Sequence, residues 1–412
     1  MTEEQNDVLV GIDIGTHKVL CVIARPSENK PGMYRILGYG YANSRGVRKG
    51  IVTDLEEVVQ SIHRAVDLAR DSAGGVPVER AWASIGGQTL TSENCSGTAV
   101  VRGNEVKQSD VDTAESNARE HSRRQGRQLI KMIPQGYSCG DTFTSTSPVG
   151  LTGDKVTAVY HAVYGSISNA ENMKRCLVRS GIELAGYEPH PWAAAKAVLD
   201  ETERYCGTVV FDMGEQTTSV ALFYENMLTY TDVRPYGAEF FTRDVATVFG
   251  ITLEQAEELK ADYGHCFPEK TLPSETVQPH VPDGQVAPAF PRRLLAQTLR
   301  ERAEEFFGLY KELLVKKGVI DKVHSVVLTG GGANLRGADE ICRRIFGVPV
   351  RIGLPRVIDG DSPLSVRSDA AVAIGLIMSA GEELAKGESR GHRTKRLPGF
   401  LSKLKATFCG DY

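Results

Sequence analysis

The alternation of apolar runs and glycine-containing turns predicts a mixed α/β protein with two similar halves. Residues 8–23 form an apolar run, a turn with glycine and threonine, and a second apolar run, which is typical of a β-hairpin. Residues 208–222 repeat this order, and each copy has an acid at the end of its first strand. The two acids, Asp13 and Asp212, lie 212 − 13 = 199 positions apart in a chain of 412 residues. This spacing predicts equivalent hairpins in two halves of the chain.

Apolar residues at helical spacing predict the helices that cover these strands. They recur over residues 55–69, after an N-capping residue at Asp54, and over residues 292–316, where we expect a long amphipathic helix. Two further helices, at residues 192–199 and 368–378, are rich in alanine. Small side chains allow close approach, so we expect these two helices to pack together between the halves.

Two segments depart from this pattern. Residues 84–165 predict a small α+β insert that carries no nucleotide-binding motif, and we interpret it as an interaction module; an excursion without function is the alternative. Residues 265–291 contain six prolines and predict a mobile loop or an extended β excursion.

Composition places the chain among ordinary globular proteins. It is 41% hydrophobic and 24% charged, and its length allows two to four domains. The net charge of −4 argues against a general nucleic-acid binder. The eight cysteines are scattered without zinc spacing, which favours a reducing compartment. The polar N-terminus and the lack of a long apolar run predict a cytosolic protein unless another segment ties it to a surface.

The end of the chain predicts such a segment. Residues 381–396 are polar and charged, and we expect a flexible linker there. A helix with one apolar face and flanking lysines then follows at residues 397–412, a composition typical of an interfacial membrane anchor. Its candidate membrane residues are Leu397, Phe400, Leu401, Lys403, Leu404, Lys405 and Phe408. The alternative is a last helix docked on the protein's own core. A helix this short buries little area, so firm attachment would need several copies on a filament.

The hairpin turns have the chemistry of a phosphate site. Backbone N–H groups of a tight turn bind phosphate oxygens, and an acid at the strand end can hold Mg²⁺ through water. Residues 329–332, TGGG, let a ligand approach the backbone without a Cβ in the way. Two hairpins, this glycine turn and two alanine-rich helices together predict a nucleotide cleft.

The order of these five elements resembles the actin superfamily, and within it the chain resembles the FtsA family of bacterial actin-like cell-division proteins. The position of the insert, the run at residues 235–264 and the charged, amphipathic end carry the closer resemblance, which spans residues 7–408. It implies an α/β fold of actin-like duplicated mixed-sheet halves around a nucleotide cleft, with an FtsA-type insert. The implied subdomains are 1A (7–83 and 166–200), 1C, the insert (84–165), 2A (201–232 and 322–380) and 2B (233–321), followed by the linker (381–396) and the terminal helix (397–412).

The resemblance also implies roles for individual residues. The nucleotide, ATP, would contact Asp13, Gly15, Thr16, Lys18, Asp212, Gly214, Thr217, Thr218, Glu257, Lys260, Gly331, Gly332 and Asn334. Asp13 and Asp212 would hold Mg²⁺ through water, and Glu188 would orient an attacking water. For Glu257 and Lys260 a solvated ion pair is the alternative.

Two positions depart from the family pattern. Gln216 stands where relatives have glycine, and Ser219 stands where they have an acid, so binding could persist with hydrolysis weak or absent.

The resemblance implies a protein that polymerises and tethers FtsZ filaments to the inner face of the cytoplasmic membrane at the division site. The FtsZ tail would dock on residues 233–321, with Arg302 and Glu305 as candidate contacts, and a solvated helix face is the alternative. The insert would bind other division proteins. Two other functions stay open: a PilM-like adaptor of a type IV pilus, and a metabolic kinase, for which no acid suited to be a general base stands out.

Overall fold

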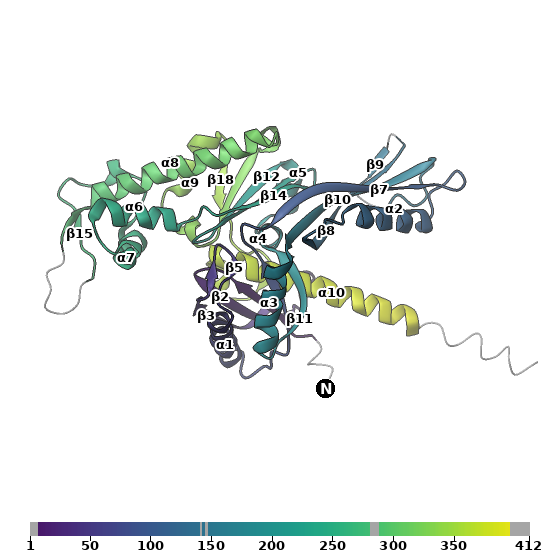
Figure 1. Ribbon diagram of the computed structural model, residues 1–412, viewed down its shortest axis with the longest axis horizontal. Helices are drawn as coiled ribbons and strands as arrows, with labels where there is room; N and C mark the ends of the chain where they lie inside the picture. Colours follow the sequence, from purple (N-terminus) through teal and green to yellow (C-terminus); the bar gives the residue numbers. More distant parts are fainter. Residues whose placement is uncertain (1–6, 141, 145–146, 281–287, 396–412) are drawn as a thin grey trace, which may run out of the picture.

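A computed structural model describes residues 7–140, 142–144, 147–280 and 288–395 (Figure 1). The first half contains a six-stranded sheet in the order β11-β6-β1-β2-β3-β19. These strands are β1 (Leu9–Ile14), β2 (Lys18–Pro26), β3 (Tyr34–Asn43), β6 (Arg80–Ile85), β11 (Glu183–Pro189) and β19 (Ile358–Asp359). A short hairpin, β4 (Val47–Arg48) and β5 (Ile51–Val52), leads into helix α1 (Leu55–Ser72). The side chain of Asp54 caps this helix by accepting the N–H of Glu57, as predicted.

Successive residues of a strand point to opposite faces, and both faces of this sheet are covered. On one face, Val10 and Ile12 of β1 belong to a core with α1 and α3 (Ile167–Arg179). On the other face, Leu20 and Val22 of β2 belong to a core with α4 (His190–Val198) and α10 (Ala371–Lys395). Burial on both faces explains why β1 and β2 read as continuous apolar runs.

The second half repeats the arrangement in a five-stranded sheet, β14-β13-β12-β17-β18. Its strands are β12 (Thr208–Met213), β13 (Thr218–Tyr224), β14 (Met227–Arg234), β17 (Ser325–Thr329) and β18 (Val350–Ile352). β12 pairs antiparallel with β13 and parallel with β17, just as β1 pairs antiparallel with β2 and parallel with β6. The predicted duplication is therefore confirmed.

Helices of the second half are α5 (Glu201–Cys206), α6 (Glu239–Phe249), α7 (Leu253–Tyr263), α8 (Arg292–Lys316) and α9 (Ala338–Phe346). Helices α6 to α9 share a core with one face of this sheet, and the short helix α5 contacts β12 and β13. Short 3₁₀ turns lie at η2 (Pro268–Lys270), η3 (Ile320–Lys322), η4 (Gly331–Asn334), η5 (Pro363–Val366) and η6 (Ser368–Ala370). The proline-rich segment contains a two-stranded pair, β15 (Thr276–Val277) with β16 (Phe290–Pro291), which agrees with the extended alternative for its described part.

The two alanine-rich helices pack directly on each other, as predicted. A Cβ on Gly375 of α10 would lie only 2.0 Å from the carbonyl oxygen of Ala193 in α4. No side chain fits at so short a distance, so only glycine, which has no Cβ, allows the two helix backbones to come this close. The crossing therefore depends on the small residues of both helices.

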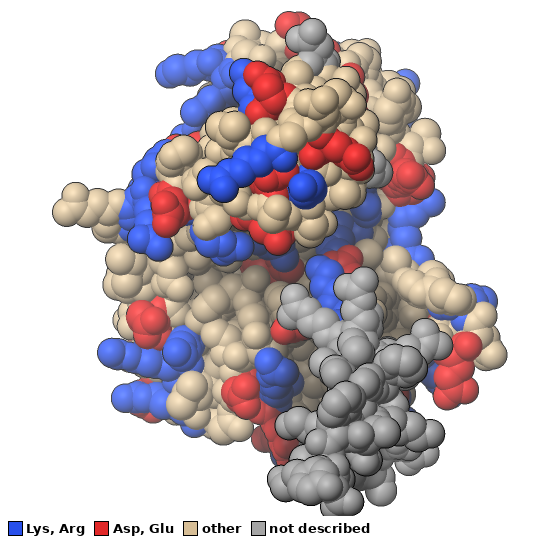
Figure 2. Space-filling view, turned by 90° about the vertical axis from the view of Figure 1, so that its right-hand side faces the viewer, with Lys and Arg blue, Asp and Glu red and all other residues tan. Residues whose placement is uncertain are grey.

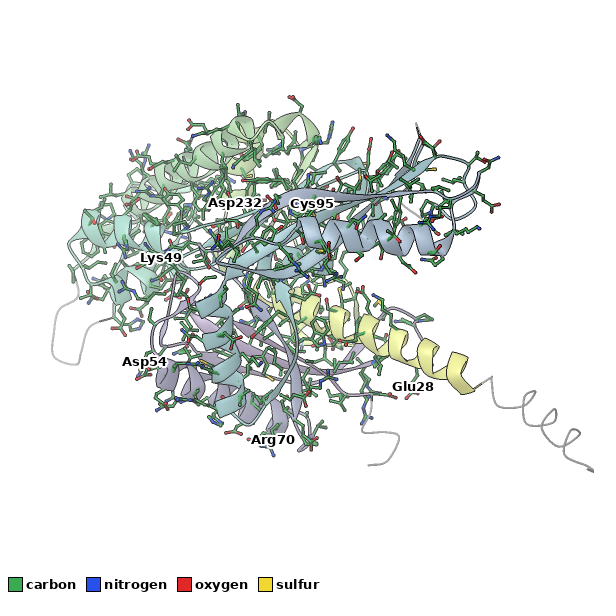
Figure 3. The ribbon with its side chains drawn as sticks, turned by 45° about the vertical axis from the view of Figure 1, so that its right-hand side comes forward. Glu28, Lys49, Asp54, Arg70, Cys95 and Asp232 are labelled. Carbon is green, nitrogen blue, oxygen red and sulfur yellow. The ribbon has the colours of Figure 1, made fainter. Side chains whose placement is uncertain are left out.

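The insert is a four-stranded sheet, β7-β10-β8-β9, with α2 (Gln108–His121) on one face. Its strands are β7 (Thr91–Val100), β8 (Arg127–Cys139), β9 (Thr142–Thr144) and β10 (Lys155–Ser166). The sheet meets the second half at β14, near the labelled Asp232 and Cys95 in Figure 3. The insert therefore contacts the second half as well as the first half from which it emerges.

The predicted linker is wrong for residues 381–395, because α10 continues as a helix through Lys395. Nine of the fifteen residues at 381–395 are Glu, Leu, Ala, Lys or Arg, and these residue types favour helix whether or not they pack on a core. In Figure 1 the last turns of α10 extend away from the first half on the side of the insert. The predicted membrane residues, 397–412, lie outside the described residues.

On the face in Figure 2, basic and acidic side chains are interspersed, in keeping with the small net charge of −4. No helix within the described ranges is long and apolar enough to cross a membrane. All cysteines in those ranges are free, and most of them are buried.

Candidate functional site

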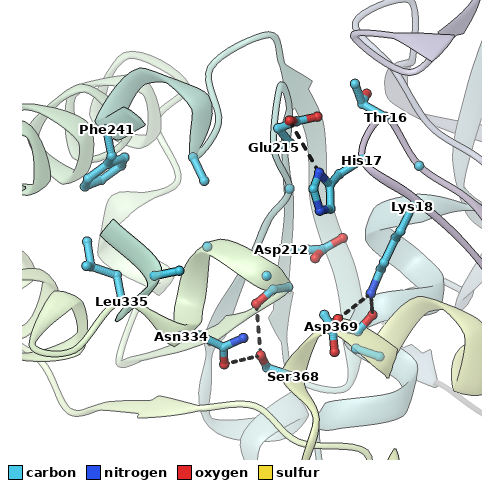
Figure 4. Close-up of a pocket in the computed structure, with 18 of the residues that line it drawn as sticks. Thr16, His17, Lys18, Asp212, Glu215, Phe241, Asn334, Leu335, Ser368 and Asp369 are labelled. Carbon is cyan, nitrogen blue, oxygen red and sulfur yellow. Dashed lines mark hydrogen bonds and ion pairs between the residues drawn. The ribbon is translucent and has the colours of Figure 1, made fainter. Parts of the chain in front are cut away.

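A cavity of about 380 Å³ opens between the two halves, within the size range of small-molecule sites (Figure 4). The turns after β1 and β12 line it from opposite halves, and η4, α7 and the start of α10 complete the wall. The two turns have the same internal geometry: the N–H of Gly15 donates to the carbonyl of Lys18, and the N–H of Gly214 donates to the carbonyl of Thr217, each at 2.9 Å. The duplicated hairpins thus bring equivalent turns to one cavity.

The glycine turn of β17 brings the backbone close to Asp212. Gly330 has a φ of 82°, and a Cβ there would lie 2.4 Å from Oδ1 of Asp212. Gly331 and Gly332 continue along the wall, and a Cβ on Gly331 would meet no protein atom within 4 Å. The TGGG motif therefore leaves a bare backbone surface at the cavity, as the sequence predicts.

Asn334 also lines the cavity, and its Oδ1 accepts a hydrogen bond of 3.0 Å from Ser368 Oγ. Glu257 and Lys260 lie on α7 and form an ion pair of 2.7 Å. Both also bond Thr242, which ties the pair to α6, although about half of the Glu257 side chain is exposed. Burial raises the pKa of Glu257, but the charge of Lys260 outweighs this and holds it below its usual value. In Figure 4, Phe241 and Leu335 form an apolar side of the same cavity.

Lys18 lines the opposite side of the cavity and is engaged by an acid that no sequence motif marks. Its Nζ lies 2.9 Å from Oδ2 of Asp369, at the entry to α10. Burial raises the pKa of Asp369, but Arg367 and Lys18 together hold it well below its usual value. Thr16 is also on the cavity wall. On this side of the cavity, the backbone of the turn after β1 therefore lies beside a lysine whose charge is paired with Asp369.

The two hairpin acids meet a histidine. Nε2 of His190 lies 3.0 Å from Oδ1 of Asp13, and its Nδ1 lies 3.0 Å from Oδ2 of Asp212. Burial alone lowers the pKa of His190, but the charges and hydrogen bonds of the two acids raise it to about 10. Burial likewise raises the pKa of Asp13, yet His190 holds it below its usual value.

These contacts test the predicted magnesium site. Both carboxylates lie at the cavity, as expected, but each already has an oxygen engaged by the ring of His190. The pair does not stand open to a cation, so the residues present do not fit the predicted metal site. Among the described residues no group of three or more metal-ligating side chains occurs.

Further contacts join the turns of the two halves at the cavity mouth. Nδ1 of His17 lies 3.5 Å from Oε1 of Glu215, and Oε1 of Gln216 accepts the N–H of Lys49 at 2.9 Å. Gln216 therefore reaches from the second hairpin to the β4–β5 hairpin of the first half, and it is not among the cavity-lining residues. The other family departure, Ser219, is buried and stands opposite Asp212 in the β12–β13 register.

Some predicted site residues lie elsewhere. Thr217 and Thr218 are not on the cavity wall; Thr218 is buried and its hydroxyl donates to the carbonyl of Tyr236. Glu188 does not line the cavity either, because its fully buried side chain turns toward the insert and pairs with Lys131 of β8. The predicted water-orienting role of Glu188 is therefore not supported by its position, and His190, two residues later, is the side chain that enters the site.

The predicted partner contact Arg302 is largely buried and fully engaged. It forms a two-point ion pair with Asp244 of α6, with Nη2–Oδ1 at 2.8 Å, and also bonds the hydroxyl of Tyr236 and a carboxylate oxygen of Glu305. Its hydrogen bonds to Asp244 raise its pKa. Arg302 therefore fixes α6 to α8 and does not present a free cation, whereas Glu305 is half exposed.

Comparison with known proteins identifies both parts of the chain. The family "Cell division protein FtsA" matches residues 209–375, and the family "SHS2 domain inserted in FTSA" matches residues 87–164. The chain is 30% identical over 380 residues to the cell division protein FtsA of Enterococcus hirae, covering 92% of this chain and 85% of that protein. It is 29% identical to the FtsA protein of Pseudomonas aeruginosa over 388 residues, covering 94% of this chain and 92% of that one.

Solved structures agree on the fold. A PilM–PilN type IV pilus biogenesis complex matches with a TM-score of 0.65 at 16% identity, covering 90% of this chain and 98% of the other. MreB5 of Spiroplasma citri bound to ADP matches with a TM-score of 0.55 at 12% identity, covering 93% of this chain and 99% of the other. The duplicated halves, the insert in the first half and the near full-length relatives show that this chain belongs to the FtsA family of cell division proteins.

Proposed function

We propose that this chain is an ATP-binding, actin-like cell-division protein that polymerises and tethers FtsZ filaments to the cytoplasmic membrane. The observation that carries the ATP part is the cavity of about 380 Å³ between the two equivalent turns. A nucleotide placed there would contact both halves at once. Binding would therefore favour one relative position of the halves, which is the physical basis for coupling nucleotide to filament formation.

The walls of the cavity suit the parts of ATP. Apart from the N–H groups of Gly15 and Gly214, which close the turns, the N–H groups of the two turns would bind phosphate oxygens. The bare backbone at Gly331 and Gly332 would lie against the nucleoside. Glu257 and Lys260 would meet the ribose and base, beside the apolar wall formed by Phe241 and its neighbours. The likeness to MreB5, solved with ADP and with AMPPNP, supports an adenine nucleotide. Magnesium is left out of this proposal because the hairpin acids are occupied by His190.

Membrane attachment is proposed from the sequence of residues 397–412, with its apolar face and lysines. A single short helix of this kind binds membranes weakly, and a filament that displays many copies would bind firmly. The FtsZ tail is proposed to dock on residues 233–321. Arg302 could contribute there only by exchanging its present carboxylate partners for those of the tail.

Co-sedimentation with anionic liposomes tests the tethering proposal. The full chain and a chain ending at Arg396 are compared with ATP and without it. We expect the full chain to pellet with liposomes when ATP is present, and the shortened chain to bind ATP equally well but stay in the supernatant. Equal pelleting of both chains would contradict the proposal that residues 397–412 anchor the protein. Equal pelleting of the full chain with ATP and without it would contradict the coupling of membrane binding to filament formation.

A pilus adaptor is the second candidate, favoured by the likeness to the PilM–PilN complex. Binding of an FtsZ tail peptide by the full chain separates the two proposals. Saturable binding supports the division function. ATP binding without tail binding or liposome pelleting favours the pilus adaptor.

A further inference from the structure

Lys18 and Asp369 form an ion pair on the wall of the cavity. Lys18 is the first residue of β2 in the first half, and both side chains line the cavity. The Nζ atom of Lys18 lies 2.9 Å from Oδ2 of Asp369 and also donates to the backbone carbonyl of Asp369. In Figure 4 the lysine and the aspartate point toward each other. The lysine is therefore bound to both the side chain and the backbone of Asp369.

Asp369 itself is held by the second half. The carbonyl of the preceding residue, Ser368, accepts a hydrogen bond of 2.9 Å from the hydroxyl of Thr329, the last residue of β17. The hydroxyl of Ser368 donates to the carbonyl of Gly330, also at 2.9 Å. The ion pair thus joins β2 of the first half to the glycine turn of the second half, across the proposed nucleotide site.

A second cation pairs with Asp369 independently of Lys18. Nε of Arg367 lies 3.0 Å from Oδ1 of Asp369, and its Nη2 lies 2.9 Å from Oδ2. The Arg367 side chain is 42% exposed, whereas the Asp369 side chain is only 10% exposed. A nearly buried acid without a partner is strongly unfavourable. Because Arg367 engages both oxygens, Asp369 can lose Lys18 without becoming an unpaired charge.

The carboxylate offers Lys18 the same chemistry that a phosphate would offer. Carboxylate and phosphate oxygens both accept charge-assisted hydrogen bonds from an ammonium group. Lys18 is 13% exposed and adjoins the turn after β1, which is proposed above to bind phosphate. Its flexible four-carbon stem lets the ammonium exchange one oxygen for another without a movement of the backbone. A phosphate in the cavity therefore has to compete with Asp369 for this lysine.

We propose that Asp369 is a positioning residue that competes with the nucleotide phosphates for Lys18 and so lowers the affinity of the site. This inference rests on the nucleotide binding proposed above and names the contact that a phosphate breaks. When Lys18 turns to a phosphate oxygen, Asp369 stays paired with Arg367. The contact between β2 and the glycine turn is then lost, so phosphate binding removes one link between the two halves.

Titration calorimetry of the full chain with ADP measures this competition. Asp369→Asn keeps the size of the side chain and removes its charge. We expect this variant to bind ADP about tenfold more tightly than the wild type, because Lys18 no longer has to leave a charged partner. Asp359→Asn is the matched control, since Asp359 is also ion-paired, with Lys30 at 2.8 Å, but does not line the cavity. The control is expected to bind ADP as the wild type does.

A second comparison separates competition for Lys18 from simple repulsion between Asp369 and the phosphates. Repulsion would persist without the lysine, whereas competition would not. Asp369→Asn is therefore also introduced together with Lys18→Met, and we expect it to give no gain in ADP affinity over Lys18→Met alone. An equal gain with and without Lys18 would show that repulsion is the cause and would overturn the inference.

The remaining outcomes distinguish this inference from the proposed function. Unchanged or weaker ADP binding by Asp369→Asn overturns the inference and leaves the nucleotide function in place. If neither the wild type nor Asp369→Asn binds ADP, the nucleotide function is overturned and the inference with it. If thermal unfolding shows that Asp369→Asn does not fold, Asp369→Ser takes its place with the same expectations.

Discussion

Acidification is expected to weaken the junction between the insert and the second half through one buried histidine. His161 of β10 is 2% exposed, and its ring nitrogens lie 2.7 Å from Oδ1 of Asn94 and 2.9 Å from the hydroxyl of Thr231 in β14. Neither partner carries a charge that would stabilise an imidazolium. Burial therefore lowers the pKa of His161 from 6.5 to about 4.

The magnitude follows from this difference in pKa. The unfolded chain binds a proton at His161 near pH 6.5, whereas the folded chain does so only near pH 4, so stability is present above pH 6.5 and is lost as the pH falls. Between pH 7 and pH 5 the loss is about 2 kcal/mol. It would reach about 3 kcal/mol at still lower pH, where both states are protonated.

Urea unfolding at pH 7 and pH 5 measures this effect. Other groups also titrate, so the wild type is compared with His161→Gln, whose side chain cannot gain the charge. We expect the wild type to lose about 2 kcal/mol more than the variant on acidification. His121→Gln, at an exposed histidine on helix α2 of the same insert, serves as the control and should follow the wild type. An equal pH dependence of the wild type and His161→Gln would refute the reasoning.

Three further changes test other contacts of the fold. Gly375→Val would press a side chain against the carbonyl of Ala193 and should lower the free energy of unfolding by about 3 kcal/mol or more, measured by chemical denaturation; an unchanged value would contradict the close helix crossing. Gln216→Ala removes the side-chain oxygen that accepts a hydrogen bond from the backbone N–H of Lys49. Hydrogen exchange at the backbone amide of Lys49 should then accelerate by about fivefold, whereas unchanged exchange would show that this contact does not hold the cleft mouth. Arg302→Glu should lower the free energy of unfolding by about 3 kcal/mol, because it leaves the carboxylate of Asp244 on α6 without its partner. A variant with normal stability that no longer binds the FtsZ tail would instead identify Arg302 as a partner contact.

The hairpins, the alanine-rich helices and the glycine turn were predictable because each has a local signal. The turn hydrogen bonds at Gly15 and Gly214 depend on residues within four positions of each other, and the apolar runs beside them read directly as buried strands. Their order along the chain then identifies the fold. Glu257 and Lys260 were also placed correctly on the cavity wall, although the family resemblance was needed to prefer this over a solvated pair.

The parts that the sequence did not reveal depend on contacts between distant residues. His190 follows the predicted Glu188-Pro pair and gives no local signal, because its role arises only when Asp13 and Asp212 come together in the fold. Glu188 has the right residue type, but strand alternation turns it toward the insert. The charge-rich end of α10 has the composition of a linker, although charged residues with high helix propensity extend an established helix equally well.

Nucleotide binding by a variant that fills the cavity tests the central claim most directly. Gly331 lines the cavity, and a Cβ there would meet no protein atom within 4 Å, so we expect Gly331→Val to fold while its side chain occupies the space proposed for the nucleotide. Gly308→Val, at a glycine of α8 with equally free surroundings outside the cavity, is the matched control. The account predicts that the wild type and Gly308→Val bind ATP in calorimetric titration and that Gly331→Val loses about tenfold or more in affinity. ATP binding that is equal in all three proteins, or absent from the wild type, would contradict it.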